Sequence, residues 1–311
     1  MKFDLLIPTR GNFENLKNIF LSIDKQTLSP QRVFVAVDKK LSKDEFDNLH
    51  YFLFKYIKNK DIRHNVNLLT NINADCFYGR GVSWLRNYLV SKSKQEFLYF
   101  LDDDNEFDAD FFERTLQIYS EIYDEQNRDF IFSPKIIYRK SWVSQSEWIK
   151  EFNFALSKVV LNTIWQAPYS VVKMIWANSL FGKREIFEKI KFDERFQFVY
   201  EDLDFSYRCY LSGFPIIVSS KLGINHMERT KTRLEKSFIW SPSDAYQKSR
   251  NRIFFVKKNG TPKERIMFFC FALWLHTFWF FYLILIHGKN KIALFKAVIK
   301  WTLDWINWDL K

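Results

Sequence analysis

Short apolar runs alternate with amphipathic segments over roughly the first 139 residues of the chain. The runs have strand length and fall at residues 3–7, 33–37, 67–70 and 97–101. The segments between them, at residues 14–26, 43–56 and 82–91, carry apolar side chains at helical spacing, as Leu16, Phe20 and Ile23 do. This alternation is typical of an α/β fold in which helices cover a mostly parallel sheet. We therefore expect one main domain, over residues 1–260, built on such a sheet.

The pattern continues less regularly beyond residue 139. We expect a strand at 174–181, a helix at 201–211 with acids in its first turn, short strands at 216–219 and 222–226, and a helix at 246–256. The Trp-rich stretch 140–165 is expected to be helical and to form part of an acceptor pocket or lid, or else an ordinary packed insertion. The charged stretch 228–236 lacks periodicity, which predicts a mobile loop.

A different pattern marks residues 261–311. Residues 266–287 contain no Lys, Arg, Asp or Glu and are long enough to cross a bilayer, but lysines lie on both sides, so orientation is not indicated. The following helical stretch has a polar face with Lys289, Lys296, Lys300 and Asp304. The opposite face is apolar, with Phe295, Ile299, Leu303 and Ile306, and a stripe of tryptophans is formed by Trp301, Trp305 and Trp308. We expect a membrane-associated unit that spans once or lies in the interface. The alternative is a hairpin packed on the main domain or on a second copy in a homo-oligomer.

Charge and composition limit the classes of partner that the chain is expected to bind. A formal charge of +11 suits nucleic acid, an anionic membrane or a phosphorylated substrate, and an aromatic content of 19% favours the membrane over nucleic acid. Cys76, Cys209 and Cys270 lie far apart, which indicates neither a disulfide framework nor a zinc site and suits a reducing cytosol. The apolar run that Pro8 ends is too short for a signal peptide. We expect the catalytic part at the cytoplasmic face of the cell membrane.

The most informative feature is the acid triplet Asp102-Asp103-Asp104, directly after the apolar run 97–101. Three adjacent carboxylates repel one another, and a divalent cation with oxygen ligands would compensate. Polar residues also end the first two runs, and the carboxyl ends of parallel strands form the ligand crevice of open α/β sheets. A later pair, Glu201-Asp202, and His226 complete a set suited to metal-dependent group transfer. Each has a simpler alternative explanation. The acids of the pair would lie at a helix N-terminus, where negative charge is favourable, and His226 would be a structural histidine.

The order of these residues resembles the GT-A fold glycosyltransferases of family 2 over residues 2–251. The resemblance is carried by Leu6-Ile7-Pro8-Thr9-Arg10, Asp38, Gly79-Arg80-Gly81 with Arg86, the DxD-like triplet and the ED pair Glu201-Asp202. The subgroup that moves rhamnosyl or galactofuranosyl residues is similar also at His226 and at Ser241-Pro242…Tyr246…Arg250-Asn251. The chain differs from the family after Asp38, where Lys39-Lys40 replaces a small residue.

The resemblance implies an inverting transferase that uses a nucleotide-diphosphate sugar and a divalent cation, Mn²⁺ or Mg²⁺. The implied donor-binding residues are Pro8, Thr9, Arg10, Asp38, Arg80, Arg86, Asp102 and Asp103. The implied metal ligands are Asp102, Asp104 and His226. Asp202 would be the base and Glu201 would position the acceptor or the base, while Trp176, Arg250 and Asn251 would bind the acceptor. That acceptor is expected to be a glycan, most simply one on a lipid carrier, in cell-surface polysaccharide synthesis.

Two other functions compete with a glycosyltransferase. A sugar nucleotidyltransferase needs a Gly-rich phosphate loop with a Lys after the first strand, and Pro8-Thr9-Arg10-Gly11-Asn12 contains none. A noncatalytic, membrane-docked scaffold would keep the fold without the chemistry. The presence of the triplet, the ED pair and His226 argues against the scaffold.

Overall fold

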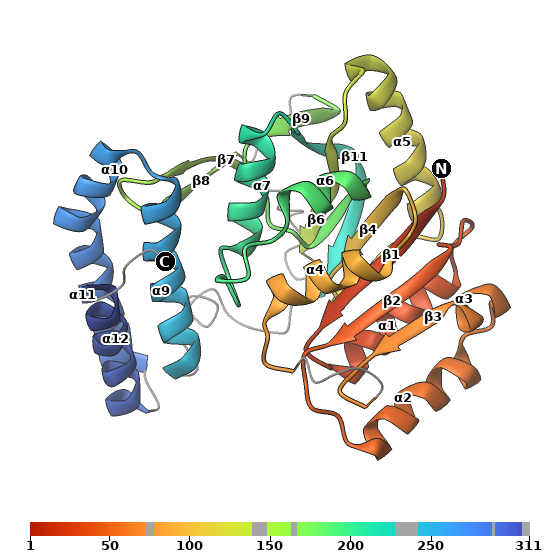
Figure 1. Cartoon of the computed structure of the whole chain (residues 1–311), viewed down its shortest axis with the longest axis horizontal. Helices are drawn as coiled ribbons and strands as arrows, with labels where there is room; N and C mark the ends of the chain where they lie inside the picture. The colour runs from red at the N-terminus through yellow and green to blue at the C-terminus, as the bar shows by residue number, and fades with distance from the viewer. Residues whose placement is uncertain (73–77, 139–147, 163–166, 228–241, 288–289, 307–311) are drawn as a thin grey trace.

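The structure is a computed structural model that describes the chain except for residues 73–77, 139–147, 163–166, 228–241, 288–289 and 307–311 (Figure 1). The strands are β1 (Phe3–Thr9), β2 (Arg32–Val37), β3 (Val66–Leu69), β4 (Phe97–Leu101), β5 (Asn105–Glu106), β6 (Ile131–Tyr138), β7 (Trp148–Asn153), β8 (Lys158–Asn162), β9 (Tyr169–Val172), β10 (Ser179–Lys183) and β11 (Ile216–His226). The helices are α1 (Phe13–Asp24), α2 (Lys43–Tyr56), α3 (Lys60–His64), α4 (Val82–Lys92), α5 (Phe111–Gln126), α6 (Arg184–Ile190), α7 (Glu201–Leu211), α9 (Pro242–Asn259), α10 (Pro262–Met267), α11 (Leu273–His287) and α12 (Lys291–Ile306), with a π-helical turn at Phe268–Ala272.

A nine-stranded sheet organises the main domain in the order β3-β2-β1-β4-β10-β6-β11-β5, with β9 paired to β11. The pairs β1–β2, β1–β4, β2–β3 and β6–β11 are parallel, whereas β10 runs antiparallel to both its neighbours. The parallel strands β1, β2 and β4 therefore end at one edge. The expected α/β class is confirmed.

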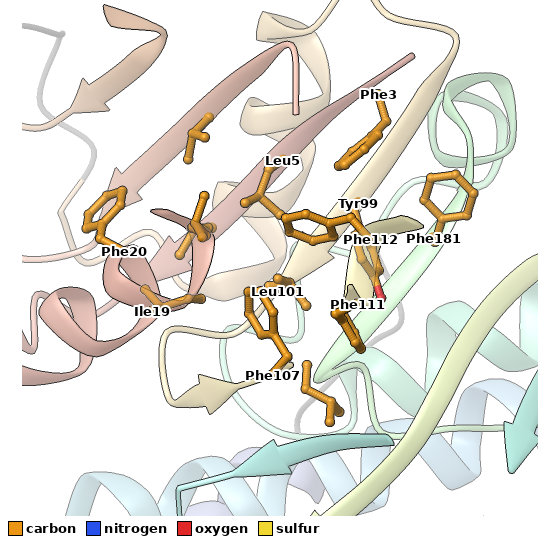
Figure 2. Close-up of a cluster of buried hydrophobic side chains, with 14 of the residues drawn as sticks. Phe3, Leu5, Ile19, Phe20, Tyr99, Leu101, Phe107, Phe111, Phe112 and Phe181 are labelled. Atoms are coloured by element: carbon orange, nitrogen blue, oxygen red, sulfur yellow. The ribbon is translucent and has the colours of Figure 1, made fainter. Parts of the chain in front are cut away.

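Apolar strands in the centre of the sheet are covered on both faces. Every residue of β1 and β4 is buried, which explains why these runs show no alternation. One face packs on α1, α2 and α5 through an aromatic cluster that includes Phe3, Tyr99 and Phe112 (Figure 2). The other packs on α4, α6 and α7. This rigid centre fixes the positions of the loops at the strand ends.

The structure differs from three expectations for the middle of the chain. Residues 140–165 are not helical where described, because β7 and β8 form an antiparallel hairpin. Its alternation buries Ile149 and Phe152 and exposes Glu151, a pattern masked in the sequence by a register irregularity between residues 149 and 151. Residues 139–147 and 163–166 of that stretch lie outside the described part.

The strand expected at 174–181 begins only at Ser179. Before it, the Ile175 amide donates to Ser206 Oγ and the Ala177 amide donates to Asp202 Oδ2, at 3.1 and 3.3 Å. Side chains of α7 thus occupy backbone donors that a longer strand would use. The two short strands expected at 216–219 and 222–226 form one strand, β11, with an irregularity between Ser219 and Gly223. The loop expected at 228–236 lies outside the described residues.

The C-terminal helices pack beside the hairpin rather than on the main sheet. Helices α9, α11 and α12 lie side by side at the left of Figure 1 and share a buried apolar cluster with β7. The stretch Pro262–Ile286 is long and apolar enough to cross a membrane, by length and composition. In α12, Lys296, Ile299 and Lys300 are exposed, and Leu294 and Val298 form its buried face. The side chains of Trp301, Leu303, Asp304, Trp305 and Ile306 are not described, and Lys289 and Trp308 lie outside the described residues.

Candidate functional site: two adjoining cavities at the ends of the parallel strands

The carboxyl ends of β1, β2 and β4 open into a cavity of about 500 Å³, here called the first cavity. Most of the residues expected at a donor site line it. They are Pro8, Thr9, Arg10, Asp38, Arg86, Asp102, Asp103 and Asp104, together with Glu201 and His226. The convergence follows from the topology, since neighbouring parallel strands end at the same edge.

The three carboxylates of the triplet point to three different partners. Asp102 Oδ1 lies 3.4 Å from Arg86 Nη2. Asp103 accepts from Thr9 Oγ1 and, at 3.3 Å, from Asn15 Nδ2. Asp104 Oδ1 lies 3.2 Å from His226 Nδ1. Because the three carboxylates point in different directions, they repel one another less than their adjacency in the sequence suggests. Burial raises the pKa of Asp102 to about 6 despite the charge of Arg86.

Strand pairing brings His226 to the triplet. Strand β5 follows the acids and pairs antiparallel with the end of β11, so that His226 is opposite Asn105. The Met227 amide donates to the Asp104 carbonyl at 2.7 Å. Buried Asn105 holds the turn from the other side, because its side-chain amide donates to the carbonyls of Asp102 and Asn178, both at 3.0 Å. The His226–Asp104 contact is therefore set by backbone register.

Two of the three expected metal ligands lie together. Asp104 Oδ1 is buried and accepts no hydrogen bond from any described residue, and the His226 ring faces it. Asp102 is instead directed to Arg86. Over the described part of the chain, no group of three or more His, Cys, Asp and Glu side chains is placed to hold a metal ion. A carboxylate and an imidazole that leave the remaining positions to ligand oxygens fit a Mg²⁺ or Mn²⁺ ion held partly by a diphosphate.

Arg86 links the triplet to the ED pair. Its guanidinium lies 3.3 Å from Glu201 Oε1 and 3.4 Å from Asp102 Oδ1, and its side chain is only 4% exposed. Burial alone would lower the pKa of Arg86, but the charges of Asp102, Glu201 and Asp202 raise it. One buried cation therefore offsets carboxylates from two distant segments.

Gly81 places the helix that carries Arg86. It has a φ of +88°, and a Cβ there would approach the Gln197 backbone to 2.7 Å. The contact lets the Val82 amide donate to the Gln197 carbonyl at 3.0 Å. Asp38 holds the preceding turn, since its carboxylate accepts from the amides of Gly79, Arg80 and Gly81. Asp38 thus lines the first cavity while fixing this loop.

Helix α7 presents Glu201 and Asp202 from its first turn. The two residues before it, Val199 and Tyr200, have φ of 57° and 70°. Such a conformation is unfavourable for a β-branched residue and typical of functional sites. Burial raises the pKa of Glu201, with a further contribution from Asp202, and burial also raises that of Asp202. Asp202 also accepts from the Leu203 amide at 2.8 Å, which fixes its orientation.

A second cavity of about 520 Å³ adjoins the first. Arg86, Asp102, Phe198 and Glu201 line both, whereas Asp202 lines only the second. Its other walls come from the hairpin, the 176–178 segment, α9 and α11, and include Phe152, Lys158, Trp176, Arg252 and His276. The ED pair therefore stands between two spaces, each large enough for part of a substrate.

Three expected binding residues lie elsewhere. Arg80 is exposed, with its guanidinium 5.9 Å from the centroid of the Trp84 ring. Arg250 donates to the Arg195 carbonyl at 2.8 Å. Asn251 is fully buried and donates to the carbonyls of Phe198 and Val199, at 2.5 and 3.1 Å. Asn251 holds the turn that precedes the ED pair, and neither Arg250 nor Asn251 lines the first or the second cavity.

Sequence reasoning missed several residues of the site. Asn105 and Asn15 hold the triplet, and Phe198 stands beneath Arg10 with 4.2 Å from guanidinium carbon to ring centroid. Adjacency to the triplet was a signal for Asn105. Phe198 carried none, because aromatic residues are common in this chain.

Comparison with known proteins identifies the fold. Crystal structures of S. aureus TarS match the chain: the 1–349 fragment in complex with UDP-GlcNAc has a TM-score of 0.58 at 18% identity, over 97% of this chain and 80% of that one. The same fragment in complex with UDP has a TM-score of 0.51 at 17% identity, over 98% and 88%. No protein-family model and no curated protein matches the chain. The expected GT-A glycosyltransferase fold is thus confirmed.

Proposed function

We propose that the chain transfers a sugar from a nucleotide-diphosphate sugar to a hydroxyl of a glycan acceptor, with inversion at the anomeric carbon. The observation that carries the proposal is the pair of cavities that meet at Arg86, Asp102 and Glu201, with Asp202 on the second side only. Direct displacement needs such an arrangement, because the acceptor hydroxyl must attack the anomeric carbon from the side opposite the diphosphate, with the base on the acceptor side.

The first cavity would hold the donor. Its position matches the crevice at the carboxyl ends of parallel strands, and TarS structures with UDP-GlcNAc and UDP share the fold. Thr9 and Asn15 fix Asp103 at the wall of this cavity. Arg10, which lies over the Phe198 ring, would supply a cation to the diphosphate of the donor. The donor base and sugar are open in this proposal.

Asp202 would accept the proton of the attacking hydroxyl. The acceptor oxygen forms a bond to the anomeric carbon while the bond from that carbon to the diphosphate oxygen breaks, and the proton passes to the Asp202 carboxylate. Burial raises the pKa of Asp202 and so makes it a stronger base than an exposed aspartate. Arg86 would keep Glu201 ionised in place beside it.

Asp104 and His226 would hold a Mg²⁺ or Mn²⁺ ion, with Asp102 reaching it directly or through water. When bound, that ion would neutralise negative charge on the diphosphate leaving group. The buried Asp104 Oδ1 with no hydrogen bond from a described residue supports the site. The His226 position also supports the rhamnosyl or galactofuranosyl subgroup as the finer assignment.

The acceptor would occupy the second cavity, where Trp176 offers a flat surface for a sugar ring and Arg252 and Lys158 suit an anionic group. We propose a glycan on a lipid carrier at the cytoplasmic face of a membrane. The apolar stretch Pro262–Ile286, whose His276 lines the same cavity, supports this choice.

Thermal shift with a panel of nucleotides tests the donor site. Nucleoside diphosphates and nucleotide sugars, with and without Mn²⁺, should raise Tm in a concentration-dependent way, and the best donor should raise it most. Leu211→Glu, a change on the exposed side of α7, is the control that should respond like the wild type. A panel with no shift would remove the donor site, and retention of the anomeric configuration in the product would exclude direct displacement.

A further inference from the structure

One side of α10 and α11 presents a continuous apolar surface to solvent. Its members recur every three or four residues and are between 42% and 72% exposed: Met267, Phe271, Trp274, Phe278, Tyr282 and Leu285. We call this set the apolar stripe. Figure 1 shows α11 at the outer edge of the molecule. An exposed apolar surface of this length marks an interaction site.

The opposite side of the same helix is buried along its whole length. Phe268, Ala272, Leu273, Phe280 and Ile284 belong to the apolar cluster formed with α9 and the β7–β8 hairpin. The helix is thus divided lengthwise into a half that packs on the protein and a half that faces outward. A helix surrounded by lipid would be apolar and exposed on all sides.

We propose that the apolar stripe docks onto the surface of an anionic lipid bilayer, with α10 and α11 lying in the plane of the interface rather than crossing the hydrocarbon. The inference deepens the proposed membrane association and rests on the proposed function only for the identity of the acceptor.

Contacts at the middle of the helix exclude a spanning orientation. His276 Nε2 lies 2.9 Å from the Leu156 carbonyl in the hairpin turn, and the Arg252 guanidinium carbon lies 5.4 Å from the centroid of the Phe280 ring. A spanning helix would carry both contacts to the centre of the bilayer. There the Arg252 charge and the outer edges of the hairpin, which pair with no other strand among the described residues, would lie in hydrocarbon, which open edges and charges avoid.

The position of the second cavity also argues against a spanning orientation of the helix. His276 lines it together with Glu201 and Asp202, so the middle of the apolar helix is next to the reacting carboxylates. A polar substrate could not reach those carboxylates at the depth of the bilayer core. With the helix in the plane, the cavity lies just above the lipid surface, within reach of a glycan attached to a lipid.

Charge favours an anionic bilayer over a second copy of the chain as the occupant. Lys263 and Arg265, with Glu264 between them, precede the stripe, and Lys291, Lys296 and Lys300 follow it. Residues 266–300 contain no Asp or Glu. Basic residues that flank an apolar helix face bind acidic head groups. Two copies of this surface would bring like charges together, which disfavours pairing.

Depth measurements with the full chain distinguish the two orientations. In a Cys76→Ser/Cys270→Ser background, with Cys209 buried and unreactive, an environment-sensitive fluorophore is attached at Phe271→Cys, Phe278→Cys or Leu285→Cys. Vesicles of phosphatidylcholine and phosphatidylglycerol carry quenchers at defined depths. The in-plane orientation predicts the same shallow depth at all three sites. A spanning helix would separate the outer two by about 21 Å along the bilayer normal, with the middle one deepest, and that result would overturn the proposal.

Vesicle flotation tests the surface itself. Phe271→Glu/Phe278→Glu should lower binding to the same vesicles about 10-fold or more, because charges replace the centre of the stripe. Leu211→Glu, a matched change at an exposed leucine on α7, should bind like the wild type. Equal binding by the stripe variant would refute docking, as would a dimer without vesicles that the stripe variant converts to a monomer. Neither assay needs donor or acceptor, so loss of transfer activity alone leaves the result intact.

Discussion

Arg86→Met tests whether one buried cation holds the two acidic segments together. The guanidinium contacts Asp102 and Glu201 at 3.4 and 3.3 Å, and the side chain is 4% exposed. Methionine keeps much of the volume and removes the charge. The buried carboxylate of Glu201 and the partly exposed carboxylate of Asp102 then lose their counter-ion.

The expected cost in the free energy of unfolding is about 3–5 kcal/mol at pH 8, the range measured when one partner of a buried ion pair is removed. Loss of the Arg86 contact with the Phe192 ring, 5.1 Å from guanidinium carbon to centroid, adds less than about 1 kcal/mol. A matched change at an exposed arginine, Arg128→Met, should cost less than about 0.5 kcal/mol.

The cost should shrink as the pH falls. Burial already raises the pKa of Asp102 to about 6 and raises that of Glu201, and Arg86 opposes both effects. Without Arg86 both pKa values rise further above the ordinary 3.8 and 4.5. The native variant then binds more protons than the unfolded chain from about pH 4 upward, so its stability falls as the pH rises through the folded-state pKa values.

Urea unfolding of the full chain in mild detergent, followed by Trp fluorescence, measures the cost in the free energy of unfolding at pH 5 and at pH 8. We expect the penalty at pH 5 to be less than half of that at pH 8. An equal loss at both pH values would refute the electrostatic argument and assign Arg86 to packing.

Three further variants and a pH profile of the wild type test the site. Asp202→Asn should abolish transfer, measured as product formed per enzyme, and leave the donor-induced Tm shift intact; normal turnover would remove Asp202 from the mechanism. In the wild type, kcat should fall as the pH drops below the raised pKa of Asp202, and a flat acid limb in a pH–rate profile would contradict this. His226→Ala should raise the Mn²⁺ concentration for half-maximal activity about 10-fold with little change in Tm, whereas unchanged metal dependence with a much lower Tm would make it a core histidine. Asn251→Ala should cost about 1–3 kcal/mol by urea unfolding, because two loop carbonyls lose a buried donor, and should lower kcat more than it changes KM for the donor; an unchanged kcat would show that the turn keeps its shape without Asn251.

The grouping of the residues that line the first cavity was largely accessible to prediction from sequence. Buried parallel strands show as continuous apolar runs, and the residue after each run is at the sheet's edge whatever the register. Thr9, Asp38 and Asp102 could therefore be placed together without knowing a single contact. The three expected metal ligands do not all lie together in the structure. The orientation of each acid depends on a partner such as Arg86 or Asn15, and the order of residues in the sequence does not reveal that partner.

The second cavity could not be derived in the same way, because its walls come from segments that share no local pattern. Residues 152–159, 176–178, 252 and 276 lie in a hairpin, an irregular stretch and two helices. The hairpin was mistaken for a helix because a local irregularity hides its alternation. Asn251 was expected at the acceptor, whereas the structure shows its side chain donating to the carbonyls of Phe198 and Val199, a contact between distant segments that no local pattern reveals.

The same reasoning explains why the apolar helix was ambiguous in sequence, whereas the structure separates its buried face from its exposed face. Composition records only that residues 266–287 carry no Lys, Arg, Asp or Glu, and a spanning helix, an interfacial helix and a packed hairpin all satisfy it. Burial divides the residues by face: Phe268, Leu273 and Phe280 pack inward, whereas Phe271 and Phe278 point outward. A helix that is half protein core and half exposed apolar surface needs a partner on one side only, and a bilayer surface lined with acidic head groups meets that need while leaving the second cavity open to water.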